Sequence, residues 1–256
     1  MNPPDPDLPR VTVLTAALNA RAALARTVDS VAVQDFADRE HVVVDGASTD
    51  GTADWLKGLD APVRWISEPD SGIAEALNKG LALARGDYVL VLQAGDTFLD
   101  AGSLGRAAGY LDGTDIVAFG VMTGPKGAEN RVMHPRFPAM RLLWKPLPHQ
   151  GILVRRDLFL WIGRFDPAFG ICMDFEWLRR AQANGASIRP GAGVLAKMPD
   201  DGISSRRDWP SLRKRFAEER RVHRMHCPGP VMAAVYAALW PPYLAYRWLR
   251  AALAAS

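Results

Sequence analysis

Residues 67–96 read "SEPDSGIAEALNKGLALARGDYVLVLQAGD", and this stretch decides the fold class. Its first half carries apolar residues at helical spacing, namely Ala74, Leu77, Leu81 and Ala84. That spacing predicts a helix with one apolar face. A continuous apolar run from Val89 to Leu92 follows and predicts a buried strand, which ends at Gly95-Asp96. A helix that leads directly into a buried strand is the repeating unit of an α/β fold.

The same alternation precedes this stretch. "VTVLTAAL" (11–18) predicts a buried strand, and Leu24, Val28 and Val31 predict the helix after it. A second apolar run, 42–44, ends at Asp45. The sequence therefore predicts an α/β fold with a largely parallel sheet. In open α/β sheets ligands bind at the carboxyl ends of the strands, where Asp45, Asp70 and Asp96 are expected to form an acidic crevice.

Bulk composition is that of a globular protein. The chain has 256 residues, 48% of them hydrophobic and 23% charged, which is ample for a sizeable core. Its two cysteines, Cys172 and Cys227, form no metal-spaced motif, so a reducing cytosol fits best. The first ten residues, "MNPPDPDLPR", lack the apolar region of a signal peptide. We therefore expect a cytoplasmic protein.

The C-terminal part has a different character. Residues 205–226 carry a net charge of +5, which leaves −2 for the rest of the chain. Residues 227–246 carry no charge and predict two short amphipathic helices bent at Pro241-Pro242. Their apolar part is too short to span a bilayer, but aromatic residues beside a basic segment suit a membrane interface. Two alternatives remain open: a solvated basic helix, and packing back onto the domain.

Three carboxylates each allow a functional and a structural interpretation. Asp45 can accept a hydrogen bond from a nucleobase or ribose, or it can shape a turn whose helix is capped by Asp50 or Thr52. Asp96 can hold a divalent cation on a diphosphate, because Mg²⁺ often uses one carboxylate plus phosphate oxygens, or it can shape a turn. Asp174, in "CMDFEW", can act as a general base or as a helix N-cap.

Several motifs occur together in one order: "VTVLTAALN", "VVVDGASTDGT", the opening stretch, "PHQGILVRRDLF", "GRFDPAFGICMDFEWLRRA" and "DGISS". In this order they resemble the inverting family-two glycosyltransferases, above all the bacterial branch that builds capsular polysaccharides, exopolysaccharides and O-antigens. The likeness runs from about Val11 to Ser205. It is specific as an ordered set, although no single motif decides it.

The resemblance implies a GT-A fold, Rossmann-like with a mostly parallel central sheet, over residues 1–205, and leaves 206–256 as a basic, aromatic helical extension. It also implies a nucleotide-diphosphate-sugar donor, with a preference for uridine, and Mg²⁺ or Mn²⁺ as cofactor. The positions that match the family's donor-binding elements are Thr15, Asp45, Asp70, Gly72, Asn78, Lys79, Gly95 and Asp96.

Other positions match the family's metal, catalytic and acceptor elements. By resemblance, Asp96 binds the metal, Asp174 is the general base, and His149, Gln150 and Ser204 line the acceptor side. A single base predicts direct displacement with inversion. Glu176 is a poor second carboxylate, because it points about 200° away from Asp174 on a helix. The Q-x-x-R-W motif of processive synthases is absent, which favours transfer of one sugar at a time.

The chain also departs from the family. Gly46 and Gly95 stand where many members have a second Asp, and this supports one rival, a sugar-nucleotide-binding protein that has lost catalysis. A nucleotidyltransferase is disfavoured because no Gly-rich phosphate loop lies near the N-terminus. Nucleic-acid binding is disfavoured because the crevice is acidic. The expected acceptor is a lipid-linked saccharide at the inner membrane face, and the oligomeric state is left open.

Overall fold

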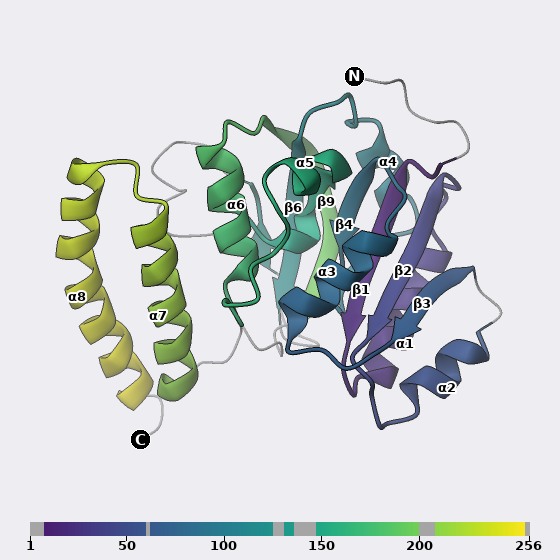
Figure 1. Cartoon of the computed structure of the whole chain (residues 1–256), viewed down its shortest axis with the longest axis horizontal. Coiled ribbons are helices and arrows are strands. Elements are labelled where there is room, and N and C mark those ends of the chain that lie inside the picture. Colours follow the sequence, from purple (N-terminus) through teal and green to yellow (C-terminus); the bar gives the residue numbers. More distant parts are fainter. Residues whose placement is uncertain (1–7, 60–61, 125–130, 136–146, 200–207, 254–256) are drawn as a thin grey trace.

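A computed structural model describes residues 8–59, 62–124, 131–135, 147–199 and 208–253 (Figure 1). Its centre is one twisted sheet with the strand order β3-β2-β1-β4-β8-β6-β9-β5, and β7 pairs with β6. Helices cover both faces of this sheet, and a helical hairpin lies at one end of the molecule.

The N-terminal four strands form the parallel half of the sheet. They are β1 (Val11–Ala17), β2 (Arg39–Asp45), β3 (Val63–Ser67) and β4 (Tyr88–Val91). β1 pairs in parallel with both β2 and β4, and β2 pairs in parallel with β3. The chain reverses its order between β1 and β4, so a ligand crevice is expected outside the carboxyl ends of these strands.

The other half of the sheet is mixed. β8 (Ile152–Arg155) is antiparallel to β4 and to β6 (Ile116–Gly124), whereas β9 (Ile188–Pro199) is parallel to β6. Two short strands, β5 (Thr97–Phe98) and β7 (Arg131–Met133), pair antiparallel with β9 and β6. The predicted parallel arrangement therefore holds throughout the N-terminal half, whereas in the other half the β6–β9 pair is parallel and the remaining pairs are antiparallel.

Helices form a layer on each face of the sheet. α3 (Ile73–Leu83), α5 (Arg156–Trp161) and α6 (Met173–Ala183) cover one face, and α1 (Arg21–Ala32) and α4 (Ser103–Ala108) cover the other (Figure 1). α2 (Thr52–Lys57) packs beside α1. Along β1, Leu14 and Ala16 join the first core, while Val11 and Val13 join the second. Burial on both faces explains the unbroken apolar runs of the sequence.

The C-terminal hairpin consists of α7 (Trp209–Met225) and α8 (Pro230–Leu253). The prediction of two short helices bent at Pro241-Pro242 is wrong, because α8 is one helix of 24 residues with both prolines inside it. Both prolines are exposed, so water can solvate the carbonyl groups that lose their helical donors. Trp240 just before them is buried against α7, and this contact holds the helix across the interruption.

The hairpin is attached to the sheet domain through α6. The ring of Phe175 on α6 meets His223 of α7 edge-on, with 5.4 Å between centroids. Val222 of α7 belongs to the main core. The extension therefore packs back onto the domain, one of the alternatives left open by the sequence. No helix in the described ranges is both long enough and apolar enough to cross a bilayer.

Candidate active site

Two loops at the carboxyl ends of β1 and β2 are bonded into one unit. The backbone N–H of Asn19 donates to Ser48 Oγ at 2.7 Å, and its side-chain oxygen accepts from the N–H of Thr49 at 2.8 Å. Asp50 accepts from the N–H of Arg21, the first residue of α1, at 2.9 Å. The loops therefore form a rigid rim beside the switch point between β1 and β4.

Asp45 lies at the end of β2, where it is fully buried. Its carboxylate accepts from the N–H of Ser48 at 3.1 Å and from Ser67 Oγ at 2.6 Å, and it also bonds the Ser48 hydroxyl. In this structure Asp45 therefore shapes the turn, and its contact with a base stays a prediction. The nearby helix α2 has Gly51 at its N-cap, and Asp50 accepts from the N–H of Thr52 at 3.2 Å.

The surroundings of Gly46 show why this position, where many family members have a second Asp, carries no side chain here. A Cβ atom at Gly46 would lie 2.5 Å from Asp70 Oδ2, so the carboxylate of Asp70 occupies the space of a side chain there. Asp70 also accepts from the N–H of Gly72 at 2.8 Å, and Gly72 has a φ of +140° that favours glycine. Asp45, Gly46 and Asp70 thus lie together at one rim of the crevice.

Lys79 and Asn78 on α3 have structural partners. Lys79 Nζ donates to the carbonyl of Pro69 at 2.6 Å and pairs with Glu68 and Glu75 at 3.3 and 3.5 Å. The amide of Asn78 exchanges two hydrogen bonds, at 2.8 and 3.0 Å, with the backbone of Phe165. Lys79 therefore steadies the turn that carries Asp70, and Asn78 ties α3 to the segment before α6. Donor contacts by either side chain stay predictions.

Thr15 lies within β1 and is fully buried. Its hydroxyl is 3.0 Å from Nε2 of His41 on β2. Burial, with a smaller contribution from Arg39, lowers the pKa of His41 to about 3, so the imidazole is neutral. Thr15 thus presents no surface to a ligand in this structure. Ser204 lies outside the described residues.

Asp96 is held in a tight turn after β4. Its Oδ2 accepts from the N–H of Gln93 at 2.9 Å and from Gln150 Nε2 at 3.0 Å. Thr27 of α1 donates to the carbonyl of Asp96 at 2.8 Å and accepts from the N–H of Gly95 at 2.9 Å. Gly95 has a φ of +107°, which the turn requires. The carboxylate is thus fixed at the end of the strand.

Asp174 lies in the first turn of α6, next to His149. The helix begins at Met173 with Cys172 as its N-cap, so the interpretation of Asp174 as the N-cap is wrong. His149 Nδ1 lies 3.0 Å from Asp174 Oδ2. Burial alone would lower the pKa of His149, but the hydrogen bond and charge of Asp174, with a contribution from Asp96, raise it. The two carboxylates therefore stabilise the charged form of the imidazole relative to a free histidine.

His149 and Gln150 are neighbours in one 3₁₀ turn, His149–Gly151. Through this turn the structure brings together Asp96, at the end of β4, and Asp174, at the start of α6. Two carboxylates from distant parts of the sequence are thereby bonded to neighbouring residues of one turn. His149 Nε2 and Gln150 Oε1 are buried and have no hydrogen-bond partner in the parts of the chain that the structure describes. A polar ligand atom or a water molecule that reached them would satisfy both.

The oxygen atoms near Asp96 fit a cation that is bound by few protein ligands. Among the described residues, no group of three or more His, Cys, Asp or Glu side chains could hold a metal ion. However, Gln150 donates to Asp96 and leaves its own oxygen without a partner beside that carboxylate. Mg²⁺ and Mn²⁺ take oxygen ligands, and Mg²⁺ often keeps water and substrate phosphates in its shell.

Glu218 on α7 is a site residue that the sequence reasoning missed. Its carboxylate accepts from three consecutive N–H groups, of Gly170, Ile171 and Cys172, at 3.1, 2.9 and 2.8 Å. These groups directly precede α6, so Glu218 fixes the start of the helix that carries Asp174. The only sequence signal is an acidic pair, 218–219, within a basic segment.

Glu219 on α7 is another partly buried carboxylate whose pKa is shifted, in part by Asp174. Burial raises the pKa of Glu219 to about 7 against the opposing charges of Arg215 and Arg247, and the charge of Asp174 adds a smaller contribution in the same direction as burial. Arg215 Nε lies 3.4 Å from the Glu219 carboxylate. In contrast, Glu176 on α6 is buried and paired with Arg180 and His226, so it faces away from the crevice.

Comparisons with known proteins show which proteins the chain is similar to. The chain is 33% identical to an uncharacterized glycosyltransferase of Mycobacterium tuberculosis, over 85% of this chain and 84% of the relative. It is also 33% identical to a PGL/p-HBAD biosynthesis glycosyltransferase of Mycobacterium bovis, over 70% and 72%. A third relative, the succinoglycan biosynthesis protein ExoO of Rhizobium meliloti, is 29% identical over 80% and 65%.

Solved structures show the same fold. The mannosyltransferase PcManGT from Pyrobaculum calidifontis, in complex with GDP-Man and Mn²⁺, aligns with a TM-score of 0.65 at 24% identity, over 99% of this chain and 77% of that chain. S. aureus TarS in complex with UDP aligns with a TM-score of 0.62 at 19% identity, over 85% and 65%. This chain thus spans less than two thirds of that TarS chain. The fold is GT-A, as predicted.

The family model described as "Glycosyl transferase family 2" matches residues 12–179, which include β1, the crevice carboxylates and the start of α6. Together with the relatives above, this match shows that the chain belongs to glycosyl transferase family 2.

Proposed function

We propose that this protein is an inverting glycosyltransferase that moves one sugar from a nucleotide-diphosphate-sugar to a hydroxyl of a saccharide acceptor. One observation carries the proposal: a single turn, His149–Gly151, joins Asp96 on the donor side to Asp174 on the acceptor side. A displacement reaction needs both a stabilised leaving group and a base for the incoming hydroxyl. The two carboxylates supply one of these functions each.

The donor's nucleoside binds along the ends of β1 and β2, where Asp45, Gly46 and Asp70 lie together. Base recognition by Asp45 requires the bonds to Ser48 to be exchanged for bonds to the ligand, because the carboxylate is already occupied. TarS is named with UDP and PcManGT with GDP-Man, so both nucleotides are candidates. Uridine is our preferred choice, from the resemblance.

Mg²⁺ or Mn²⁺ is the proposed cofactor, and Asp96 with the side-chain oxygen of Gln150 would hold it, the rest of its ligands coming from the substrate and water. When bound, the cation supplies a positive charge that stabilises the departing diphosphate. Gln93 N–H and Gln150 Nε2 orient the Asp96 carboxylate toward this role. Gly95 lets the backbone approach the diphosphate closely.

Asp174 is the proposed general base. It accepts the proton of the acceptor hydroxyl as that oxygen attacks the anomeric carbon. His149 donates to Asp174 Oδ2 and so orients the carboxylate, while the start of α6 favours its negative charge. No second carboxylate of α6 is free to act as a nucleophile, because Glu176 is buried with Arg180 and His226. One base with no nucleophile corresponds to inversion.

The proposed acceptor is a lipid-linked saccharide of cell-surface polysaccharide synthesis. The names of the PGL/p-HBAD and succinoglycan relatives support this class. A peripheral position at the inner membrane face is supported by exposed Tyr246, Trp248 and Leu249 on α8, beside exposed Arg250. Aromatic and basic residues together suit the headgroup region. The enzyme would then work from the cytoplasmic side.

The direct test offers a panel of nucleotide-sugars with Mn²⁺ and an acceptor, and measures release of free nucleoside diphosphate. We expect turnover with one donor and a product of inverted anomeric configuration by NMR. Binding of a donor without any turnover would instead favour a sugar-nucleotide-binding protein. A retained configuration would refute the single-displacement mechanism.

Membrane contact has its own test. Cosedimentation with anionic phospholipid vesicles is compared for the native chain and the double variant Trp248→Ser/Leu249→Ser. These side chains are more than half exposed, so the fold is expected to survive. We expect binding to fall in the variant and to weaken with salt. Unchanged binding, or no binding of the native chain, would refute the contact.

A further inference from the structure

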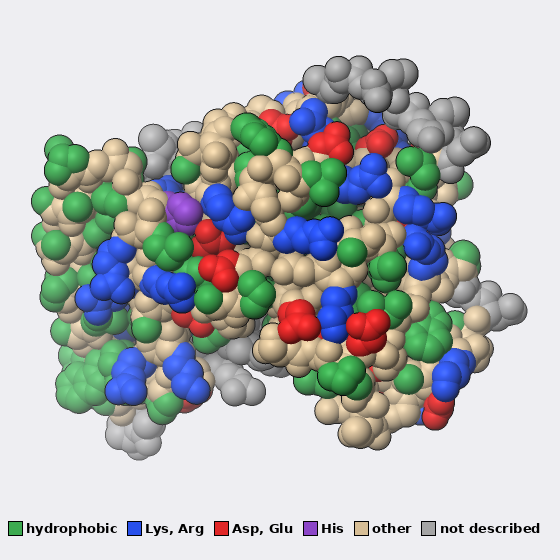
Figure 2. Space-filling view, viewed as in Figure 1, with side chains coloured by type: hydrophobic (Ala, Val, Ile, Leu, Met, Phe, Trp, Pro, Cys, Tyr) green, Lys and Arg blue, Asp and Glu red, His purple; other side chains and the backbone are tan. Residues whose placement is uncertain are grey.

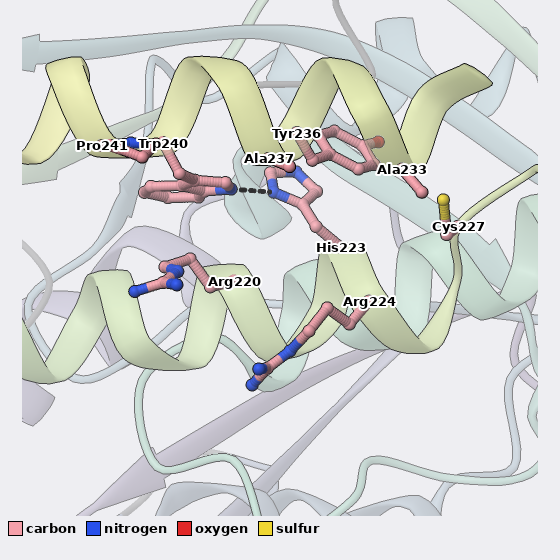
Figure 3. A pocket seen from close by; sticks show the side chains of 9 residues that line it. All are labelled: Arg220, His223, Arg224, Cys227, Ala233, Tyr236, Ala237, Trp240 and Pro241. Atoms are coloured by element: carbon pink, nitrogen blue, oxygen red, sulfur yellow. Dashed lines mark hydrogen bonds between the residues drawn. The ribbon is translucent and has the colours of Figure 1, made fainter. Parts of the chain in front are cut away.

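A groove of about 330 Å³ runs between α7 and α8, on the hairpin and apart from the crevice carboxylates (Figure 3). This volume lies within the range of small-molecule sites. It is open because Ala233 and Ala237, one helical turn apart on α8, leave room above α7. The rings of Tyr236 and Trp240 line its apolar interior, and both residues are more than nine-tenths buried.

Two arginines lie along the α7 side of this groove. Arg220 and Arg224 are exposed, lie one turn apart, and are among the residues that line the groove. Figure 3 shows both on α7, with the side chain of Arg224 extending across α7 away from α8. Within the described ranges neither has an anionic partner, whereas Arg215 on the same helix pairs with Glu219. Like charges four residues apart repel each other, so an anion between them would be stabilising. Arginine is also the side chain best shaped for phosphate oxygens.

The groove also contains a polar group without a partner. The hydroxyl of Tyr236 is buried and makes no hydrogen bond to any residue that the structure describes. A buried hydroxyl is normally satisfied, so this one indicates a water molecule or a polar ligand atom at its end of the groove, beyond the part that a hydrocarbon chain would fill. Figure 3 shows the hydroxyl at the end of the groove near Cys227.

We propose that the α7–α8 groove binds a lipid molecule, with one hydrocarbon chain against Tyr236 and Trp240 and a phosphate head on Arg220 and Arg224. The apolar interior favours a chain over a sugar, and the unpaired arginines favour an anionic head over a neutral one. The binding involves no group of the catalytic crevice, so it stands or falls independently of the transferase reaction.

Cys227 provides a reporter for occupancy. It lines the groove and is partly exposed, whereas Cys172 is buried with a pKa raised by that burial. A maleimide is therefore expected to modify Cys227 in the folded protein and Cys172 only after unfolding. The test measures the rate of Cys227 modification by mass spectrometry, with Cys172 as the internal check on folding.

The ligand probe is dodecyl phosphate below its micelle concentration. We expect it to slow modification of Cys227 several-fold, while dodecyl maltoside and inorganic phosphate at the same concentration have little effect. The protection should disappear in Arg220→Gln/Arg224→Gln. It should persist in Arg213→Gln/Lys214→Gln, which removes the same charge from exposed positions of α7 outside the groove.

A second variant, Ala237→Phe, fills the groove and should also remove the protection. If it does not fold, Cys172 becomes reactive and the arginine variants decide alone. The proposal is overturned if dodecyl phosphate gives no protection, if either comparator protects as well, or if protection persists without both arginines. None of these measurements requires a sugar donor, so their outcome does not depend on the proposed transferase activity.

Discussion

The imidazole Nδ1 of His149 and the carboxylate of Asp174 lie 3.0 Å apart, although 25 residues separate them in the sequence. This pair links the turn after residue 148 to the first turn of α6. Because Gln150, the next residue, bonds Asp96, any displacement of this turn moves both proposed reactive carboxylates together. The pair is therefore a first target for experiments.

Replacing the proposed base should remove chemistry and leave binding intact. In Asp174→Asn we expect kcat to fall by roughly 10²–10⁴, the usual contribution of a general base. The dissociation constant for the donor should stay unchanged in calorimetry, since Asp174 lies on the acceptor side. Asp157→Asn, at an exposed position of α5, is the matched control. A fully active Asp174→Asn enzyme would show that another group is the base.

The His149–Asp174 pair should make stability depend on pH. The pKa of His149 is raised above its ordinary 6.5, so the folded state holds the proton more tightly than the unfolded state. The stabilisation is complete below about pH 6.5 and is lost as the pH rises through the raised value. It should amount to at most about 1.5–3 kcal/mol, the range for a hydrogen bond to a charged group.

Urea unfolding of the native chain and His149→Gln, from about pH 5.5 to about pH 9, measures this effect. Glutamine keeps a donor but does not titrate. The stability difference between the two proteins should shrink as the pH rises. A difference that is constant over this range would mean that the imidazole carries no pH-linked stabilisation.

Glu218 should control the position of Asp174. Glu218→Gln removes the charge that holds three N–H groups before α6, so we expect a loss of about 1–3 kcal/mol in unfolding free energy. We also expect kcat to fall more than donor affinity. Glu218→Asp should restore part of both properties, because it keeps the charge.

Asp54→Asn, an exposed carboxylate on α2, is the control for Glu218 and should change stability by less than about 0.5 kcal/mol. If Glu218→Gln lost stability but kept kcat, the residue would support the fold without positioning the base. Stability and kcat are therefore measured on the same preparations.

Gly46 should accept a side chain more readily when Asp70 is shortened. Gly46→Ala places its Cβ 2.5 Å from Asp70 Oδ2, the terminal atom of a side chain that can rotate, and we expect a cost of about 0.5–1 kcal/mol as this carboxylate shifts. In Asp70→Ala the same substitution should cost much less, so the double-mutant cycle in urea should show coupling. Additive effects would mean that the two positions do not compete for space.

The affinity of the enzyme for its metal ion should depend on Gln150. After treatment with EDTA we expect turnover to stop and to return with Mn²⁺. Gln150→Ala should raise the half-saturating Mn²⁺ concentration about 10–100-fold, the usual effect of losing a group that orients a metal ligand. Asp174→Asn should keep Mn²⁺-dependent donor binding. Full turnover in EDTA would contradict the proposed cofactor.

Much of this arrangement follows from local sequence, and the exceptions have a common cause. Strands such as 42–44 and the helix around Leu77 are visible because burial sets their periodicity. The pairings of Asp96 with Gln150 and of Asp174 with His149 depend on how β4, β8 and α6 are placed in space, which no local pattern contains. Those residues were found through the family resemblance, and their contacts through the structure.

The roles of side chains that bond to distant backbone are not encoded in local sequence. Lys79 and Asn78 match a donor motif, yet each is bonded to the backbone of a neighbouring segment. Glu218 gave no usable signal, because its three partners lie 46 to 48 residues away. The prolines of α8 predicted a break, but packing of Trp240 on α7 outweighed the local cost.

The surface of the hairpin carries most of its basic side chains on α7, next to the sheet domain (Figure 2). Since Glu218 of that same helix holds the start of α6, the hairpin is not an interchangeable tail. A chimera that combines this catalytic domain with the C-terminal helices of a relative that lack this carboxylate would lose the hydrogen bonds to Glu218 that fix the start of α6 and thereby Asp174. The two parts are therefore expected to evolve as one unit, and replacing the hairpin is expected to lower kcat.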